Sequence, residues 1–494
     1  MRPLFGVGSV PLRDRADYRC RRGNADLSFF AELEHFSANT AAIDAHGTPY
    51  RYGELVDAAD TFGRALQTDR KSLVFILCRN NIETLAGYLG TLRAGHTGVL
   101  LAANTDRGLM ANLLELYRPD FIWGPSDRGG DARFTWKGYA LSAGPSPREE
   151  AIHPELALLL STSGSTGSPK MVRLTAANLE ANAQSIAEYL ALDETERPIT
   201  SLPMNYSYGL SVVNSHLKVG ATLLLTDASI ITRPFWTAFN DLKATSFAGV
   251  PYTYEMLRRI KFFTMDLPGL RTMTQAGGKL TPEFAREFAE YAAANQLRFF
   301  IMYGQTEATA RISYVPPEQA VEKHRSIGVA IPRGELRLID GDGNPITQPG
   351  VDGELVYTGP NVMLGYAQSS ADLVKGNELN GELHTGDIAR FDDDGFYYVT
   401  GRKKRFIKIF GNRVNLDEIE HYLKGRGYVS VCGGRDDLLC VATTEPGKVD
   451  EIKKLVTATY GFHHTAVRVA EVAEILKSAS GKIQYERIFE GMLD

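Results

Sequence analysis

The stretch LALLLSTSGSTGSPKMVRL, residues 156–174, places a loop rich in glycine and hydroxyl groups between two apolar runs. Residues 156–160 have the length and apolarity of a buried strand, and 171–174 form a second short strand candidate. Thr175 suits the N-cap of a following helix, whose apolar residues recur on one face. The stretch therefore predicts a strand, a loop, a strand and a helix in succession, in preference to a flexible Ser/Gly linker.

The loop between these strands has the composition of a phosphate-binding loop. Glycine lets the backbone approach a ligand closely, hydroxyls bond to phosphate oxygens, and lysine adds a compact positive charge. The spacing is not that of a Walker loop, because Gly164 and Gly167 are three apart and Met171 follows Lys170. The candidate binding residues are Thr162, Ser163, Gly164, Ser165, Thr166, Gly167 and Lys170.

Length and composition are those of an ordinary soluble globular protein. The 494 residues suggest two to four domains, with 44% hydrophobic and 23% charged residues and a net charge of −5. This balance gives no reason to expect nucleic acid, and no run of about 18 uncharged apolar residues indicates a membrane span. The four cysteines are scattered, and the arginine-rich N-terminus lacks an apolar signal core. We predict a cytoplasmic protein with reduced thiols and neither a nucleic-acid nor a membrane partner.

Strand-like and helical segments alternate up to about residue 400, which predicts an α/β fold with largely parallel sheets. Strand candidates include 72–77, 221–225 and 299–302, and a helix is expected over 82–92. Between about 335 and 400, Gly-rich turns separate short strands, as in antiparallel hairpins. The last 90 or so residues predict a small α+β domain, with helices over 415–425 and 449–459.

Two polar motifs lie in this α/β part. Residues 303–307, YGQTE, follow the apolar strand 299–302, at the strand end where α/β folds place ligands. Tyr303 can stack on a base, Thr306 can bond to phosphate, and Glu307 can hold magnesium, which prefers oxygen ligands. In HTGD, residues 384–387, the carboxylate of Asp387 suits the paired hydroxyls of a ribose. Taken alone, each motif is equally compatible with an ordinary turn.

Two basic motifs follow. Five of the eight residues 401–408 are basic, which is usual for a nucleic-acid patch or a solvated face. Their place, between the strand-rich segment and the C-terminal part, instead favours a hinge that also meets phosphate charge. Ser480-Gly481-Lys482 is a second Gly-Lys pair on a predicted loop.

The order of these motifs resembles that of the AMP-forming adenylating enzymes, which include acyl-CoA synthetases, adenylation domains of nonribosomal peptide synthetases and firefly luciferase. The resemblance runs from about residue 40 to 490, and STSGSTGSPK is highly specific for it. YGQTE matches the family's YGxTE. The remaining matches, in the family's order, are GEL at 353–355, VMLGY at 362–366, TGD at 385–387, GR at 401–402 and SGK at 480–482.

This resemblance implies a large N-terminal domain, residues 1–401, and a small mobile α+β domain, residues 402–494. The large domain would hold two mainly parallel sheets with helices plus a small β-barrel-like part. The implied reaction has two halves: a carboxylate attacks the α-phosphate of ATP to give an acyl-adenylate and pyrophosphate, and a nucleophile then takes the acyl group and releases AMP. The small domain would rotate between the halves about Lys404, withdrawing Lys482 and bringing 408–415 to the site.

The resemblance also implies roles for individual residues, with ATP and Mg²⁺ as cofactors. Residues 163–170 would grip the β- and γ-phosphates, Thr306 would contact the α-phosphate, and Glu307 would hold magnesium. Lys482 would bridge the acid and the α-phosphate oxygens. The catalytic set is thus Lys170, Thr306, Glu307 and Lys482. The nucleotide set adds Gly277, Gly278, Lys279 and Tyr303 around adenine, Asp387 and Arg402 at the ribose, and Gly304 and Gln305 in the motif itself.

The implied acyl pocket includes Asn205, Tyr206, Tyr208, Ala248 and Gly249. Amino-acid-activating relatives place an aspartate near Asn205 to pair with the substrate ammonium. Residues 204–210 of this chain contain no acidic side chain. Because a buried ammonium without a counter-charge is costly, a free α-amino acid is disfavoured. Tyr-Gly-Leu resembles benzoate-type CoA ligases, and the two tyrosines favour a flat or cyclic acid of modest size. The alternative is that both tyrosines only fill the core.

The acceptor stays open among CoA, a separate carrier protein and an amino acid or other amine. Leu416 stands where CoA ligases usually carry proline, and Tyr485 where they usually carry arginine. Both differences keep an amide-forming ligase, similar to coronafacate ligase, as the main alternative. Only 12 residues follow Lys482, so we expect an enzyme that stands alone. A non-catalytic protein on the same fold is disfavoured because Lys170, Glu307, Asp387 and Lys482 are all present.

Overall fold

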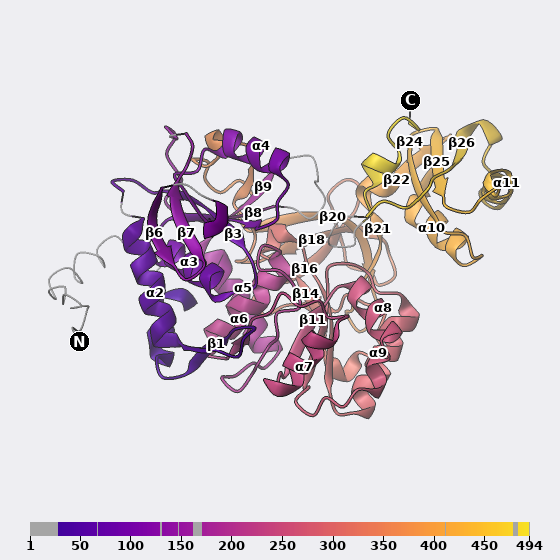
Figure 1. Cartoon of the computed structure of the whole chain (residues 1–494). Coiled ribbons are helices and arrows are strands. Elements are labelled where there is room, and N and C mark those ends of the chain that lie inside the picture. The colour runs from indigo at the N-terminus through magenta and orange to yellow at the C-terminus, as the bar shows by residue number, and fades with distance from the viewer. Residues whose placement is uncertain are drawn as a thin grey trace, which may run out of the picture.

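The computed structural model describes residues 28–66, 68–128, 131–146, 148–161, 170–410, 412–477 and 483–493 (Figure 1). A large body contains the chain up to about residue 402, and a smaller body containing the last strands and helices stands to one side of it. Among the described helices, none has both the length and the apolarity that crossing a membrane requires.

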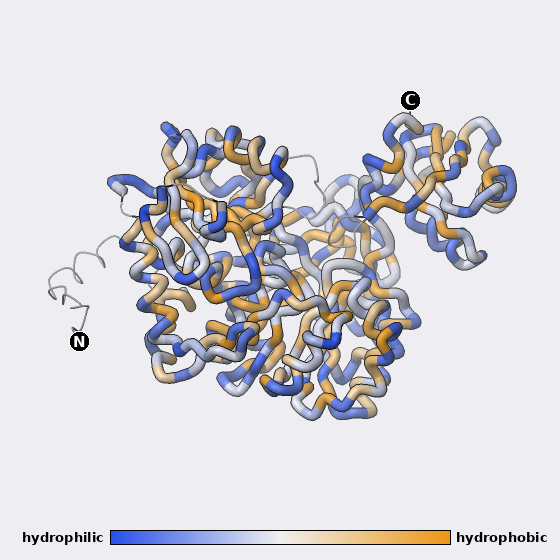
Figure 2. Tube along the Cα trace, viewed as in Figure 1, coloured by the Kyte–Doolittle hydropathy of each residue, from blue (hydrophilic) through white to orange (hydrophobic). Residues whose placement is uncertain are grey.

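The first layer of the large body is an eight-stranded sheet with a parallel centre. The central strands β5, β3, β4 and β8 are parallel, and antiparallel strands extend the sheet at both edges. Every residue of β3 is buried, as a strand covered on both faces requires. Figure 2 shows strongly hydrophobic segments in this region. The strands are β3 (Leu73–Cys78), β4 (Thr97–Ala102), β5 (Phe121–Pro125), β6 (Ala132–Trp136), β7 (Tyr139–Ala143), β8 (Leu156–Ser161), β9 (Met171–Thr175) and β19 (Gly365–Ala367).

The second layer is a five-stranded sheet in which β11, β12 and β13 are parallel and β14 and β15 antiparallel. Its strands are β11 (Ser246–Gly249), β12 (Thr272–Gln275), β13 (Arg298–Tyr303), β14 (Ser313–Val315) and β15 (Val329–Ala330). The helices α5 (Ala176–Tyr189) and α6 (Ser207–Lys218) contribute side chains to the cores of both layers. The two helices therefore join the sheets, and the start of α6 reaches the carboxyl ends of the second sheet.

Other helices cover the two sheets, and one antiparallel sheet and one small mixed sheet complete the large body. The helices are α2 (Tyr52–Ala65), α3 (Ile82–Arg93), α4 (Arg107–Tyr117), α7 (Arg233–Asp241), α8 (Pro251–Arg259) and α9 (Pro282–Ala294). A five-stranded antiparallel sheet, in the order β17-β16-β18-β20-β21, contains β16 (Glu335–Ile339), β17 (Pro345–Ile346), β18 (Gly353–Thr358), β20 (Glu382–Phe391) and β21 (Tyr397–Arg402). A small sheet contains β1 (Thr40–Ile43), β2 (Pro49–Arg51) and β10 (Leu223–Leu224).

The smaller body has a core of its own, formed by residues such as Ile419, Val441 and Ile452. Its elements are β22 (Phe406–Ile409), β23 (Asn412–Asn415), α10 (Leu416–Lys424), β24 (Ser430–Arg435), β25 (Leu438–Thr443), α11 (Val449–Tyr460), β26 (Val467–Glu471) and α12 (Tyr485–Ile488). The predicted α/β class, the strands 72–77 and 299–302, and the helices over 82–92, 415–425 and 449–459 are confirmed within one or two residues.

Close packing of α3 on the first sheet depends on a glycine. A Cβ added at Gly87 would lie 2.3 Å from Cδ1 of Trp123, whose ring is fully buried and has no room to move. We expect Gly87→Ala to lower the free energy of unfolding by about 1–3 kcal/mol, even though alanine favours the helix. The exposed Gly341, where a Cβ would meet nothing within 4 Å, is the control. Chemical denaturation of both variants tests this, and equal midpoints would contradict it.

Candidate active site

The pairing of β8 with β9 positions Lys170, which lies directly before the first residue of β9. Ser161 lies opposite Met171 in this antiparallel pair, so the intervening loop begins and ends at neighbouring points. Residues 162–169, which contain Thr162, Ser163, Gly164, Ser165, Thr166 and Gly167, lie outside the described residues, and their binding roles stay predictions. Thr175 caps α5 as expected, because its side chain accepts a hydrogen bond from the Asn178 amide.

Tyr366, to which the sequence assigned no role, contacts both Lys170 and Glu307. The ammonium of Lys170 lies 3.4 Å from the centre of the Tyr366 ring, a cation–π contact. The hydroxyl of Tyr366 donates a hydrogen bond to Oε1 of Glu307 at 2.8 Å. Burial, and then the nearby carboxylate, raises the pKa of the Tyr366 hydroxyl, which therefore stays a neutral donor. Lys170, Tyr366 and Glu307 thus form one continuous row, which we call the charged row.

The charged row suits a phosphate–magnesium group. Glu307 follows β13 in a 3₁₀ turn, Thr306–Ala308, is half-buried, and accepts one tyrosine hydroxyl. The described residues contain no cluster of three or more His, Cys, Asp or Glu side chains that could hold a metal by themselves. A magnesium ion here would therefore be held by Glu307 together with phosphate oxygens, which is how this ion usually binds in phosphate sites.

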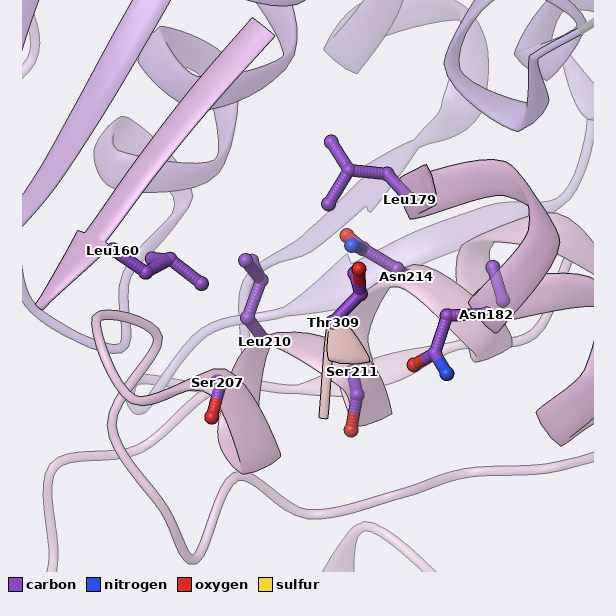
Figure 3. A pocket seen from close by; sticks show the side chains of 9 residues that line it. Leu160, Leu179, Asn182, Ser207, Leu210, Ser211, Asn214 and Thr309 are labelled. Atoms are coloured by element: carbon purple, nitrogen blue, oxygen red, sulfur yellow. The ribbon is translucent and has the colours of Figure 1, made fainter. Parts of the chain in front are cut away.

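Thr306 is supported from behind by the first turn of α6. Its hydroxyl lies 3.1 Å from the hydroxyl of Ser207, the first residue of α6. A buried pocket of about 10 Å³ adjoins this pair, between the end of β8, α5 and α6 (Figure 3). Oδ1 of Asn182 on its wall is buried and without a hydrogen-bond partner in the described structure, so the pocket has the size and polarity for one water. Ser207 lies between the predicted acyl residues Tyr206 and Tyr208, and the sequence pattern assigned it no role.

Gly304 is required by the tight return of the chain after the YGQTE motif. A Cβ added at Gly304 would lie 1.7 Å from the carbonyl oxygen of Ala310. The motif and residues 310–312 are thus in backbone contact, and the Ile312 amide donates to the Tyr303 carbonyl at 2.9 Å. Any side chain at 304 would push these two segments apart.

Asp387 is the centre of the predicted ribose site. The carboxylate is 2% exposed and lies in β20 opposite Arg402 of β21, whose Nε is 3.1 Å from Oδ1. The Tyr303 hydroxyl donates to Oδ2, and the Gln305 amide donates to Oδ2 and to the Tyr303 hydroxyl, each at 3.1 Å. The structure thus joins four predicted nucleotide residues in one network.

The carboxylate of Asp387 has little free capacity in this arrangement. It offers about four acceptor positions, and Tyr303, Gln305 and Arg402 use three. A ribose with two hydroxyls would have to displace one of these donors. The Arg402 side chain is 64% exposed, whereas Tyr303 and Gln305 are half-buried, so Arg402 is the donor most easily displaced.

Three of the residues predicted to enclose adenine, Gly277, Gly278 and Lys279, follow the end of β12, and the fourth, Tyr303, ends β13. Gly277 has a φ of +81°, and a Cβ there would lie 2.5 Å from the Tyr206 hydroxyl. The side-chain amide of Gln275 stabilises the turn by donating to the Gly278 carbonyl at 2.8 Å. Lys279 instead reaches the antiparallel sheet, where its ammonium donates to the Val399 carbonyl at 3.2 Å.

The predicted acyl residues gather between the start of α6 and the ends of β11 and β12. Tyr206 and Tyr208 make an edge-on ring contact with centres 6.2 Å apart. The hydroxyl of Tyr208 donates to Thr274 of β12 at 2.9 Å. Ala248 is buried at the end of β11, where Gly249 packs against α8, and Asn205 is half-buried before α6. Tyr206 therefore stands between the acyl segment and the predicted adenine turn.

The candidates in the smaller body are only partly described. Lys404 belongs to the 3₁₀ turn Lys403–Arg405 directly after β21, and Lys482 lies outside the described residues. Arg405, the last residue of this turn, pairs with Asp417 at 2.7 Å and with Glu420, and its guanidinium lies 4.0 Å over the ring of Tyr485. Tyr485 is thus part of an internal network between the turn and α10.

Comparison with known proteins identifies the family. The sequence model of the AMP-binding enzyme family matches residues 29–367, about two thirds of the chain. The chain belongs to this family. It is a ligase of the AMP-forming kind.

Three relatives illustrate the range of the family. An oxalate–CoA ligase of Arabidopsis thaliana is 30% identical over 366 residues, 71% of this chain and 70% of the relative. A 2-succinylbenzoate–CoA ligase of Bacillus licheniformis is 33% identical over 59% of this chain and 60% of the relative. Matches to several other curated relatives span little more than half of their length. The fold matches O-succinylbenzoate coenzyme A synthetase of Bacillus subtilis, solved with ATP and magnesium, with a TM-score of 0.74, 21% identity, and 93% and 99% of the two chains covered.

The charged row allows the two functions of Tyr366 to be tested apart. Tyr366→Phe keeps the ring beneath Lys170 but removes the hydrogen bond to Glu307, whereas Tyr366→Leu removes both contacts. We expect about a 3- to 10-fold loss of kcat/KM for ATP in Tyr366→Phe, and a further 3- to 10-fold in Tyr366→Leu, from a hydrogen bond and a cation–π contact of about 1 kcal/mol each. ATP–pyrophosphate exchange measures both losses, and equal activity of the two variants would exclude a role for the ring contact.

Proposed function

We propose that this protein uses ATP to activate a small aromatic or cyclic carboxylic acid as its acyl-adenylate and then transfers the acyl group to CoA. The charged row carries this proposal, because Lys170 and Glu307 stand beside Thr306 at the carboxyl end of β13. The first half-reaction brings a carboxylate toward a polyphosphate, and the mutual repulsion of these anions is its main obstacle. A lysine and a magnesium-binding carboxylate next to a phosphate-binding hydroxyl provide the required screening.

The arrangement supports one placement of ATP along the site. In this proposal Lys170 and the loop before it hold the β- and γ-phosphates, Thr306 holds the α-phosphate, and Glu307 holds magnesium. The ribose hydroxyls bind to Asp387, and one of them replaces Arg402 as a donor to this carboxylate. Adenine then lies near Tyr303 and the turn 277–279. Residues 1–401 and 402–494 act as separate domains, with the hinge at Lys404 next to the buried Arg405 network.

The acid is proposed from the pocket between α6 and the second sheet. Residues 204–210 contain no carboxylate that could pair with an ammonium, and the rings of Tyr206 and Tyr208 meet edge-on with their centres 6.2 Å apart. An aromatic or alicyclic ring gains contact area against these two rings at little entropic cost. The name of the Bacillus licheniformis relative, a 2-succinylbenzoate–CoA ligase, indicates an aromatic acid as its substrate and supports this choice.

CoA is the first choice of acceptor because the named relatives are CoA ligases. A second candidate is amide formation with an amino acid or amine, or loading of a separate carrier protein. One observation favours it: Tyr485 replaces the usual arginine, and its ring and hydroxyl are occupied by Arg405 and Glu420. A side chain held in this way brings no positive charge to a CoA phosphate.

Measuring the two half-reactions separately tests the role of Lys482. We expect Lys482→Ala to reduce adenylate formation far more than use of preformed adenylate, by about 2.7–4 kcal/mol in activation free energy, the usual effect of losing a transition-state donor. Lys477→Ala, at an exposed lysine five residues earlier, is the control. Pyrophosphate exchange measures the first half, and product release from synthetic acyl-adenylate measures the second. Equal losses in both halves would mean that Lys482 is structural.

The acceptor can be decided once pyrophosphate exchange has identified an acid. With that acid and ATP, we expect a CoA thioester by mass spectrometry when CoA is the only nucleophile present. Incubation with a panel of amino acids, each in place of CoA, tests amide formation. An amide without a thioester would assign the protein to the amide-forming ligases. Failure of pyrophosphate exchange with every acid tried would contradict the proposed function itself.

A further inference from the structure

Arg311 is a buried cation that has no carboxylate partner among the residues the structure describes. It is 1% exposed, and its guanidinium carbon lies 4.0 Å from the centre of the Tyr208 ring. In the described part of the chain, its Nε has no hydrogen-bond partner, and the ion pairs found there involve other arginines. The undescribed loop 162–169 contains no acidic residue. A buried charge that lacks a counter-ion is costly to keep, so this one requires an explanation.

The other buried arginines of the large body make the contrast clear. Arg93 pairs with Asp60 and Glu34, Arg148 with Asp120, and Arg173 with Glu378. These three therefore act as internal ion pairs that hold segments together. Arg311 is equally buried, and the groups found against its guanidinium in the described structure are the Tyr208 ring and the Tyr189 hydroxyl.

A cavity of about 20 Å³ lies beside Arg311, and one of the acyl-pocket candidates, Ala248, is part of its lining. Ala248 and Thr274 line it at the end that meets Tyr208, and Ser246 and Thr272 line it one step deeper along β11 and β12. It has room for about one water. Because Ala248 and Tyr208 are both acyl-pocket candidates, Arg311 stands at the boundary between that pocket and the cavity.

The polar groups in this cavity differ from one end to the other. His216, roughly 12 Å from Tyr208 along α6, also lines it, and burial lowers the pKa of this histidine to about 4. Its Nδ1 donates to the Val212 carbonyl at 2.8 Å, which leaves Nε2 as an unpaired acceptor. The hydroxyl of Thr272 is also buried and unpaired in the described structure. The deep end thus suits water, whereas the Arg311 end offers an N–H donor and a positive charge, which suit an anion.

The backbone holds Arg311 in this place against its own preference. The two residues before it have left-handed φ angles, 55° at Thr309 and 106° at Ala310, and the second is rare for a residue with a side chain. The same turn brings the Ala310 carbonyl against Gly304 of the YGQTE motif. Strained backbone of this kind persists where the surroundings fix it, and it is common at binding sites.

We propose that Arg311 recognises a second carboxylate on the acid, so that the substrate is a dicarboxylic acid. One carboxylate is activated by ATP, and the other pairs with the Arg311 guanidinium near Tyr208 and Thr274. A charge-assisted pair at this position supplies the missing counter-ion and displaces water that holds the space without substrate. An acid with an apolar or neutral far end leaves the guanidinium unpaired and is rejected. This inference rests on the proposed function and narrows its substrate class.

The first test uses the unaltered protein and matched acids. Phthalate, isophthalate, terephthalate and the cyclohexane dicarboxylates are each compared with their monomethyl esters, and with benzoate and cyclohexane carboxylate, in ATP–pyrophosphate exchange. We expect at least one diacid to exceed its monoester by about 100-fold or more in kcat/KM. If a monoacid is used as well as or better than every diacid, the inference is wrong and the proposed function still stands. Failure of every acid would instead contradict both.

The second test removes the charge. Arg311→Met should abolish the preference for the diacid, a loss of about 100-fold in its kcat/KM, while monoacid rates change less than about 3-fold. Arg311→Lys should restore part of the preference, because it returns the charge without the guanidinium. Arg258→Met, at an exposed arginine over the Phe284 ring, is the matched control. An equal loss for diacids and monoacids would show that Arg311 only positions Tyr208, and would overturn the proposal.

Discussion

The pairing of β9 with β19 brings together the parts of the chain on which the site depends. β9 begins directly after Lys170, and β19 contains Tyr366, which lies opposite Val172. Arg173, fully buried in β9, reinforces this pair through the Tyr366 carbonyl at 3.1 Å and through Glu378. Without this contact, the ring of Tyr366 would not lie between the ammonium of Lys170 and the carboxylate of Glu307, because these groups come from three distant segments.

In the charged row, the two charges are held apart by a neutral hydrogen-bond donor. Tyr366 separates Lys170 from Glu307, whereas Asp387 accepts from the neutral Tyr303 and Gln305 and also pairs directly with Arg402. A direct lysine–glutamate pair would satisfy both charges and leave less for a ligand, whereas a tyrosine hydroxyl uses only one of the carboxylate's acceptor positions. The arrangement therefore keeps positive charge available for phosphate and negative charge available for a cation.

Local sequence predicted the elements well because their signals are local. The apolar run 156–160, the capping Thr175 and the strand before YGQTE each depend on a few adjacent residues, and each is confirmed. The family motifs likewise named Lys170, Glu307 and Asp387. The partners of these residues could not be predicted in this way, because Tyr366, Ser207 and the exposed position of Arg402 depend on contacts between segments 59 to 99 residues apart or on the packing of whole sheets. The roles assigned to the site residues all remain predictions, and residues 162–167 and 480–482 in addition lie outside the described structure.

Arg311 shows most clearly what the sequence does not reveal. In the printed chain it follows YGQTEATA as one arginine among many, and nothing in its neighbours indicates burial. Its environment arises because α6 brings Tyr208 over the guanidinium while the turn at Thr309 and Ala310 directs the chain inward. In the proposed function, a cation fixed in this way would select between acids by their far ends, whereas the charged row would act on phosphates that every acid meets alike. Recognition of the acid and activation of its carboxylate are therefore assigned to different segments that meet at Gly304, where the motif and the turn are in backbone contact.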